Sequence, residues 1–219
     1  MNKVLAIYGA GGLGREILEL AYAINKKSKR WEEIVFIDDQ LSNQTINGIK
    51  VYSYQEIVTI FPAKIEATIG VGEPAVREKL FKKLEKDNIP IATLIHPNTY
   101  IPESTKIGYG VTIQDCCFIS CNVTIEDFVF IQPNVNVGHD DLLKKGCIVS
   151  GLVNLSGHVT IGQNTYIGIS TAIKQGITIG DYCIVGMCSG VYHDIPDEMI
   201  AIGNPARPIK KNEEHIVFK

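Results

Sequence analysis

The sequence lacks three features that would assign it to common functional classes. Its 21 lysines and arginines are outnumbered by 24 aspartates and glutamates, which gives a net charge of −3 and a pI near 6.0. Binding to the nucleic-acid backbone needs a positive field, so we expect no nucleic-acid partner. No apolar run approaches the roughly 18 residues that span a bilayer. The N-terminal residues resemble a strand and a turn without a signal-peptide cleavage region, so we expect a cytoplasmic protein with no membrane insertion.

The six cysteines include no CxxC pair, which argues against a zinc ribbon. We expect reduced thiols that serve in packing. The 219 residues are 45% hydrophobic, enough for the core of one large domain or two small ones.

From residue 101 onward, an aliphatic residue recurs at every sixth position. A second column, usually small or β-branched, follows four residues after each. A period of six excludes an α-helix, whose period is 3.6, and fits stacked coils of short strands around a continuous core. Three hexapeptides make a coil of 18 residues, so the sequence predicts a parallel β-helix of about five coils. The first column is Ile101, Ile107, Ile113, Ile119, Ile125, Ile131, Val137, Leu143, Val149, Leu155, Ile161, Ile167, Ile173, Ile179, Val185 and Val191.

Before residue 101 the pattern changes to strands that alternate with amphipathic helices, which predicts a parallel sheet with right-handed crossovers. The strands are KVLAIYG, EIVFIDD, ATIGVG and PIATLIHP. A turn near Pro97 marks the boundary. We therefore predict an α/β, half-Rossmann-like domain over residues 1–97, a β-helix domain over 98–208 and a tail over 209–219.

The first strand runs into a glycine-rich turn, residues 9–14, that matches G-x-G-x-x-G. Asp38 and Asp39 end the second strand, which is the placement used to bind the phosphate and ribose of a nucleotide. Gly72 ends the third strand and faces the same crevice. About four strands are too few for a full dinucleotide fold, so a mononucleotide or nucleotide sugar fits better than NAD. A tight turn without a ligand is the alternative.

The motifs YGAGGLG, FIDD, IGVGEPAVR, VGHDD, SGHVTIG and GNPARPI span the whole chain. Their order resembles the family of hexapeptide-repeat sugar acetyltransferases that contains PglD and NeuD. The resemblance implies a left-handed β-helix, a homotrimer that binds acetyl-CoA between subunits, and an N-terminal domain that holds a nucleotide-activated amino sugar. His139, His158 and His193 lack the close paired spacing of a metal site, so we expect no metal.

The resemblance also implies roles for individual residues. His139 matches the catalytic base, Asp140 the acid that increases its basicity, and Gly157 the backbone N–H that meets the thioester carbonyl. Acetyl-CoA contacts fall at Gly157, Ile148, Ile169 and Met187. Nucleotide-sugar contacts fall at Gly11, Gly12, Leu13, Asp38, Asp39 and Gly72.

The residues around His139 support the same chemistry independently. Histidine is a natural base at neutral pH, and Gly157, one coil further on, leaves room beside the imidazole for a pantetheine arm. Neighbouring residues of a strand point to opposite faces, so Asp140 reaches His139 only if the chain turns there. Asp141, which interrupts the second column, is the alternative partner. His158 could line the same cleft.

The predicted function is therefore acetyl-CoA-dependent N-acetylation of a nucleotide-activated amino sugar in bacterial glycan biosynthesis, by direct transfer with His139 as the base. The alternatives are O-acetylation of a sialic-acid-like sugar, a metal hydratase on the same fold, and a non-catalytic nucleotide-binding trimer. Arg207, Lys210 and Lys211 are candidates to meet the phosphates of the coenzyme, or they belong to a solvated basic tail.

Overall fold

The computed structural model describes residues 3–61 and 64–218. It divides into two compact units, one of residues Met1–Gly72 and Val76–Leu94 and one of residues Glu73–Ala75 and Ile95–Lys219. Residues 1, 2, 62 and 63 of the predicted first domain and residue 219 of the predicted tail lie outside the described residues. Among the helices that the structure describes, none is long and apolar enough to cross a membrane.

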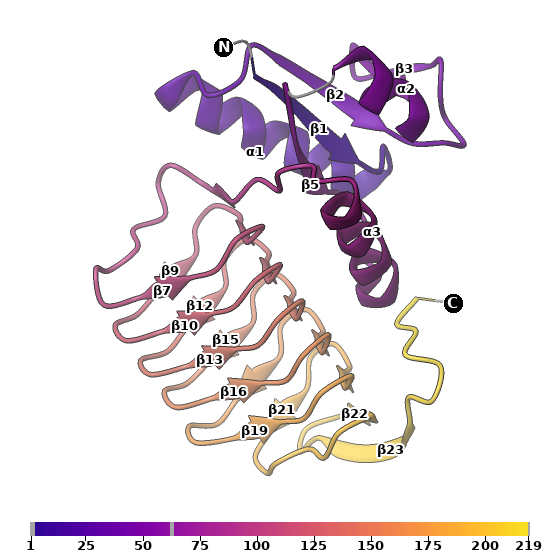
Figure 1. The fold of residues 1–219 in the computed structure, drawn as a ribbon. Helices are drawn as coiled ribbons and strands as arrows, with labels where there is room; N and C mark the ends of the chain where they lie inside the picture. The colour runs from indigo at the N-terminus through magenta and orange to yellow at the C-terminus, as the bar shows by residue number, and fades with distance from the viewer. Residues whose placement is uncertain (1–2, 62–63, 219) are drawn as a thin grey trace. The chain divides into compact units, whose positions relative to one another are not determined.

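The first unit is built on a five-stranded sheet with the strand order β3-β4-β2-β1-β5 (Figure 1). Strands β4, β2, β1 and β5 are parallel, and β3 pairs antiparallel with β4. The buried residues of α1 recur at helical spacing and pack against β1 and β2 in one core. The elements are β1 (Val4–Tyr8), α1 (Gly12–Ser28), β2 (Glu33–Ile37), β3 (Thr45–Ile46), β4 (Ile49–Tyr52), α2 (Tyr54–Ile60), β5 (Ile65–Ile69) and α3 (Pro74–Lys86).

The predicted α/β architecture is confirmed, and the structure adds a hairpin and a short helix that the sequence patterns did not indicate. Strands β3 and β4 and helix α2 fill the segment between β2 and β5. Helix α2 begins with a capping box, in which the Ser53 side chain accepts from the Glu56 N–H and the Glu56 side chain accepts from the Ser53 N–H. The last predicted strand, PIATLIHP, is reduced to β6 (Leu94–Ile95).

The second unit stacks short parallel strands in rungs, the arrangement of a left-handed parallel β-helix (Figure 1). Each strand pairs with the strand three positions along the chain, so residues 18 apart lie side by side, as in Phe130 with Ile148. The strands are β7 (Lys106–Ile107), β8 (Thr112–Ile113), β9 (Phe118–Ile119), β10 (Thr124–Ile125), β11 (Phe130–Ile131), β12 (Asn136–Val137), β13 (Leu142–Leu143), β14 (Ile148–Val149), β15 (Asn154–Leu155), β16 (Thr160–Ile161), β17 (Tyr166–Ile167), β18 (Ala172–Ile173), β19 (Thr178–Ile179), β20 (Ile184–Val185) and β21 (Gly190–Val191).

The core of this unit is the pair of columns predicted from the hexapeptide period. From Val111 to Val191 the aliphatic members of both columns are buried in one continuous cluster, and Ile101 and Ile107 pack against its end. The chain then closes with an antiparallel pair, β22 (Met199–Ile202) and β23 (Arg207–Lys211). The predicted start of the tail at residue 209 therefore falls within a strand.

Between consecutive strands the chain turns at a corner, and most corners contain a residue with positive φ. Asn122, Asp140 and His158 have φ values of 58°, 61° and 58° and occupy equivalent corners of successive coils. The left-handed conformation lets the chain turn within two residues. Neighbouring side chains at a corner therefore need not point to opposite faces, as they do within a strand.

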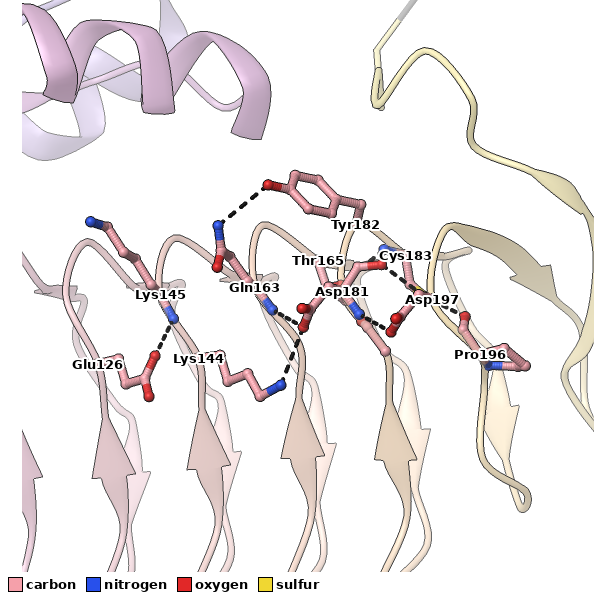
Figure 2. A network of polar contacts seen from close by, with 11 residues as sticks. Glu126, Lys144, Lys145, Gln163, Thr165, Asp181, Tyr182, Cys183, Pro196 and Asp197 are labelled. Carbon is pink, nitrogen blue, oxygen red and sulfur yellow. Dashed lines mark hydrogen bonds and ion pairs between the residues drawn. The ribbon is translucent and has the colours of Figure 1, made fainter.

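A second set of corners is stabilised by acidic side chains that accept hydrogen bonds from backbone amides (Figure 2). The Gln163 N–H donates to Asp181 Oδ1 at 2.8 Å, and the Asp181 N–H donates to Asp197 Oδ1 at 2.8 Å. The Lys145 N–H donates to Glu126 Oε2 at 2.8 Å. Amides that the coil-to-coil ladder leaves unpaired at these corners are thereby satisfied.

Truncation of the core column should destabilise the β-helix strongly. Ile167→Ala removes a fully buried side chain, and the lost burial and the cavity should lower the free energy of unfolding by about 2–5 kcal/mol. The matched control is Lys174→Ala, whose polar side chain is exposed just after β18; its change should stay within about 0.5 kcal/mol. Denaturant unfolding measures both. Equal losses would contradict the placement of the core.

Candidate active site

His139 and Asp140 form the corner between β12 and β13, and their side chains meet. His139 Nδ1 lies 2.7 Å from Asp140 Oδ2. The contact is formed because Asp140 is in the left-handed conformation, so the two adjacent side chains are not directed to opposite faces. With Nδ1 donating to the carboxylate, the other ring nitrogen, Nε2, is left as the proton acceptor.

The imidazole of His139 lies directly against Gly157 of the next coil. A Cβ atom at residue 157 would come within 2.4 Å of His139 Cε1 and Nε2, so any larger residue would force the imidazole to move. The Gly157 N–H donates no hydrogen bond within the described residues, in contrast to the capped amides of Gln163 and Asp181. A bare amide therefore lies beside the ring that can accept a proton.

Two further side chains reach Asp140 from the neighbouring coils. Asn122 Nδ2 donates to Asp140 Oδ1 at 3.1 Å, and His158 Nε2 lies 3.6 Å from Asp140 Oδ2. The hydrogen bond from His139 is the main cause that lowers the pKa of Asp140, and the hydrogen bond from Asn122 is the second. The carboxylate is therefore ionised at neutral pH. Asn122 was not identified from the sequence, although counting one coil back from Asp140 leads to it.

His158 lies close to His139, with the two rings in a T-shaped contact at 5.0 Å between centroids. Ligand atoms of His139, Asp140 and His158 all lie within 4.8 Å of one another, so these three side chains are also able to hold a metal ion. All three residues are exposed. The solvent-facing position expected for His158 from the hexapeptide period is therefore confirmed.

Asp141 points into the core and contacts backbone, not the imidazole. Its side chain is 1% exposed, and its two oxygens accept from the N–H groups of Gly138 at 2.8 Å and Val159 at 2.7 Å. Burial raises its pKa to about 7. Strand β12, which precedes this corner, pairs with β15 at one position only, Asn136 with Asn154. The structure thus brings Asp140, rather than Asp141, to His139.

The predicted acetyl-CoA contacts differ in accessibility. Met187 is 67% exposed and Ile169 is also exposed, and they occupy equivalent corner positions one coil apart. The Cys188 N–H donates to Ile169 O at 2.9 Å, which joins the two corners. Ile148 lies in β14 and is only 1% exposed. The structure brings Ile169 and Met187 together on the surface and leaves Ile148 beneath it.

In the α/β unit, the glycines of the first turn divide into two kinds. A Cβ on Gly14 would lie 1.9 Å from Gly9 O, so these two glycines permit the close approach of β1 and α1. Gly11 and Gly12 have open space where a Cβ would lie. Helix α1 begins at Gly12 with no side-chain cap. Its first amides are therefore accessible to an anion such as a phosphate.

The two predicted acids after β2 support the loops at this edge of the sheet. Asp38 Oδ2 accepts from the Ala10 N–H at 3.3 Å, and Asp39 Oδ1 accepts from the Tyr54 N–H at 2.8 Å at the start of α2. Leu13 and Gly72 are both half-buried. Asp38 is thus coupled to the glycine turn by a direct contact.

Family models match both halves of the chain. Residues 4–84 match the PglD N-terminal domain, and residues 158–193 match the bacterial transferase hexapeptide (six repeats). The acetyltransferase domain of PglB from Neisseria gonorrhoeae is 30% identical, with 95% of this chain and 100% of that chain covered and a TM-score of 0.88. The chain belongs to the hexapeptide-repeat sugar acetyltransferase family. The family and enzyme class predicted from the sequence are confirmed.

Several proteins that are similar to this chain are known with their ligands or substrates. The PglB domain has also been solved in complex with acetyl coenzyme A. GDP-perosamine N-acetyltransferase of Escherichia coli O157:H7 is 29% identical over 98% of this chain and 100% of that protein. PerB from Caulobacter crescentus, solved with CoA and GDP-perosamine, shares the fold at a TM-score of 0.87 and 24% identity, over 96% of this chain and 98% of that one.

Replacing Asp141 should change how the stability of this acetyltransferase depends on pH. In the folded chain the carboxyl keeps its proton up to about pH 7, whereas in the unfolded chain it releases it near its ordinary pKa of about 4. The folded state binds more protons between these values, so its free energy of unfolding falls as the pH rises through this window. The substitution Asp141→Asn should remove that fall.

Denaturant unfolding near pH 5 and pH 8 measures the effect. The stability of Asp141→Asn relative to the parent chain should be higher at the alkaline pH. Glu103→Gln, at an exposed position, should follow the parent chain at both. An equal difference at both pH values for Asp141→Asn would contradict the raised pKa.

Proposed function

We propose that this acetyltransferase moves the acetyl group of acetyl-CoA to the amino group of a nucleotide-activated amino sugar, with His139 as the general base. The observation that carries the proposal is the His139 ring, held by Asp140 at 2.7 Å and lying against Gly157, whose N–H is free within the described residues. The similarity to GDP-perosamine N-acetyltransferase of E. coli supports the substrate class.

The reaction is a direct transfer in one addition and one elimination. The sugar amine attacks the thioester carbonyl, and His139 Nε2 accepts the proton that the nitrogen loses. The oxyanion accepts a hydrogen bond from the Gly157 N–H, a type of contact that contributes about 3–4 kcal/mol in comparable sites. The C–S bond then breaks, and the proton on His139 passes to the departing thiolate to give CoA.

Asp140 supports this step in two ways. It fixes the tautomer by accepting from Nδ1, and its negative charge stabilises the imidazolium that forms when Nε2 takes the proton. The lowered pKa of Asp140 keeps the carboxylate charged at neutral pH.

For the coenzyme, the proposal assigns two surfaces of the β-helix unit. Exposed Ile169 and Met187 offer apolar contacts to the pantetheine arm, together with Gly157 near its acyl end. Arg207, Lys210 and Lys211 lie exposed in β23 and provide positive charge for the phosphates. Ile148 is assigned to the same site as a supporting residue beneath the surface.

For the nucleotide, the proposal assigns the open turn of the α/β unit. Gly11, Gly12 and Leu13 offer uncapped backbone amides at the start of α1. Asp38 and Asp39 hold this edge of the sheet in shape, and Gly72 follows the neighbouring strand β5. An anionic diphosphate is the ligand that such a helix start prefers.

We also propose that the chain works as a homotrimer in the cytoplasm. Large apolar side chains are exposed on the β-helix at Phe118, Leu152, Ile169 and Met187, all at or next to the corners between β8 and β9 and their equivalents in later coils. A row of exposed apolar side chains is typical of a surface that is buried between subunits. A coenzyme site completed by a second subunit would use the same row.

The function is tested by following CoA release with acetyl-CoA and a panel of GDP-, UDP- and dTDP-linked amino sugars. The parent chain should turn over one of the amines. His139→Ala should lose at least about 100-fold in kcat, which is the contribution of a general base. Gly157→Ala should lose a similar factor, because the new Cβ displaces the ring.

Both variants should keep the oligomeric state and thermal stability of the parent chain. Near-normal turnover by His139→Ala would overturn the base assignment. Release of CoA only with hydroxyl acceptors would convert the proposal to O-acetylation, and no release with any acceptor would favour a non-catalytic nucleotide-binding protein.

Charge reversal on β23 should weaken coenzyme binding selectively. The triple substitution of Arg207, Lys210 and Lys211 by Glu replaces attraction to the CoA phosphates by repulsion, so the KM for acetyl-CoA should rise about tenfold or more while the KM for the sugar stays unchanged. Steady-state kinetics measures both. Lys106→Glu, exposed in β7, is the matched control. An unchanged KM for acetyl-CoA would reject the assignment.

A further inference from the structure

We propose that Asn122 is a positioning residue for acetyl transfer, whose side-chain amide holds the Asp140 carboxylate in the orientation that aligns the imidazole of His139. This inference deepens the proposed function and rests on it, because it takes His139 to be the base. Asn122 acts through Asp140 and is not assigned any contact with the substrate or the coenzyme.

The position of Asn122 follows from the registry of the coils. Asn122 and Asp140 are 18 residues apart, at equivalent corners of neighbouring coils, and both have positive φ. The Asp140 N–H donates to Cys121 O at 3.1 Å, and the His158 N–H donates to His139 O at 2.9 Å. These backbone bonds hold successive corners in register, so the side chain of Asn122 is next to that of Asp140.

The two oxygens of the Asp140 carboxylate have different hydrogen-bond partners. Oδ2 lies 2.7 Å from His139 Nδ1, and Oδ1 accepts from Asn122 Nδ2 at 3.1 Å. A carboxylate with both oxygens engaged cannot rotate about its Cβ–Cγ bond without losing a hydrogen bond. The Asp140 side chain is 36% exposed, so packing alone does not fix its rotation. Asn122 supplies the missing constraint.

Asn122 is itself held in place, and asparagine meets both demands of its position. Its backbone N–H donates to Ser104 Oγ of the preceding coil at 3.0 Å. Asparagine tolerates the left-handed conformation better than most residues, and its amide provides the N–H donor that a carboxylate requires. Aspartate would place a like charge beside Asp140, and glycine would satisfy only the backbone.

The effect of Asn122 should appear in turnover and not in stability. The residue is exposed, and an exposed polar contact contributes little to folding. Its hydrogen bond is one of the contacts that lower the pKa of Asp140. Loss of the bond should therefore leave the fold intact while the imidazole becomes less well aligned, which affects the reaction step more than substrate binding.

The test uses Asn122→Gly in the full-length protein, because glycine adopts a φ of 58° without strain and removes only the side chain. We expect kcat to fall roughly tenfold, with KM values for acetyl-CoA and sugar within about twofold of the parent. The matched control is Asn47→Gly, since Asn47 is also exposed and has a φ of 50°, in the turn between β3 and β4. Its kcat should not change.

A double-mutant cycle with Asp140→Asn separates positioning from a general structural effect. If Asn122 acts through Asp140, adding Asn122→Gly to Asp140→Asn should change kcat by less than about twofold. Equal fractional losses in both backgrounds, or Asn122→Gly behaving like Asn47→Gly, would overturn the inference. If His139→Ala loses its rate while Asn122→Gly does not, the inference fails and the proposed function stands; if His139→Ala keeps its rate, both fail.

Discussion

The hydrogen-bonded registry between successive coils is the constraint on which the site depends. It places residues 18 apart beside one another, as the strand pairs and the corner bond from the His158 N–H to His139 O show. The His139 ring meets Gly157, and Asp140 meets Asn122, only because the coils are in this register. A slip of one rung would remove both contacts, and with them the proposed base and oxyanion donor.

The corner that holds His139 differs from the corners of Figure 2 in how its backbone amides are satisfied. At the corners of Figure 2, carboxylates satisfy the free backbone amides, whereas the Gly157 N–H has no acceptor within the described residues. Next to it, Asp141 places a carboxyl group in the core, where burial raises its pKa to about 7. Local departures of this kind are expected where a structure serves a reaction and not only its own stability.

Much of this arrangement could be predicted from the sequence, since the hexapeptide period defines the core columns and one coil leads from His139 to Gly157. The contact of His139 with Asp140 was implied by the family resemblance, but the residue pattern left Asp141 as an alternative, because strand alternation separates adjacent side chains and the left-handed φ of Asp140 is visible only in the structure. The hairpin of β3 and β4 is too short to carry a recognisable period. The burial of Ile148 depends on packing that no local pattern encodes.

A structure of the protein with acetyl-CoA would test the central claim most directly. The account predicts that the thioester carbonyl oxygen accepts a hydrogen bond from the Gly157 N–H, at about 2.7–3.1 Å, the range for an oxyanion donor. His139 Nε2 should then face the carbonyl carbon, with room for an amine between them. A coenzyme whose acyl end lies at another corner, or a His139 ring that turns away from it, would contradict the account.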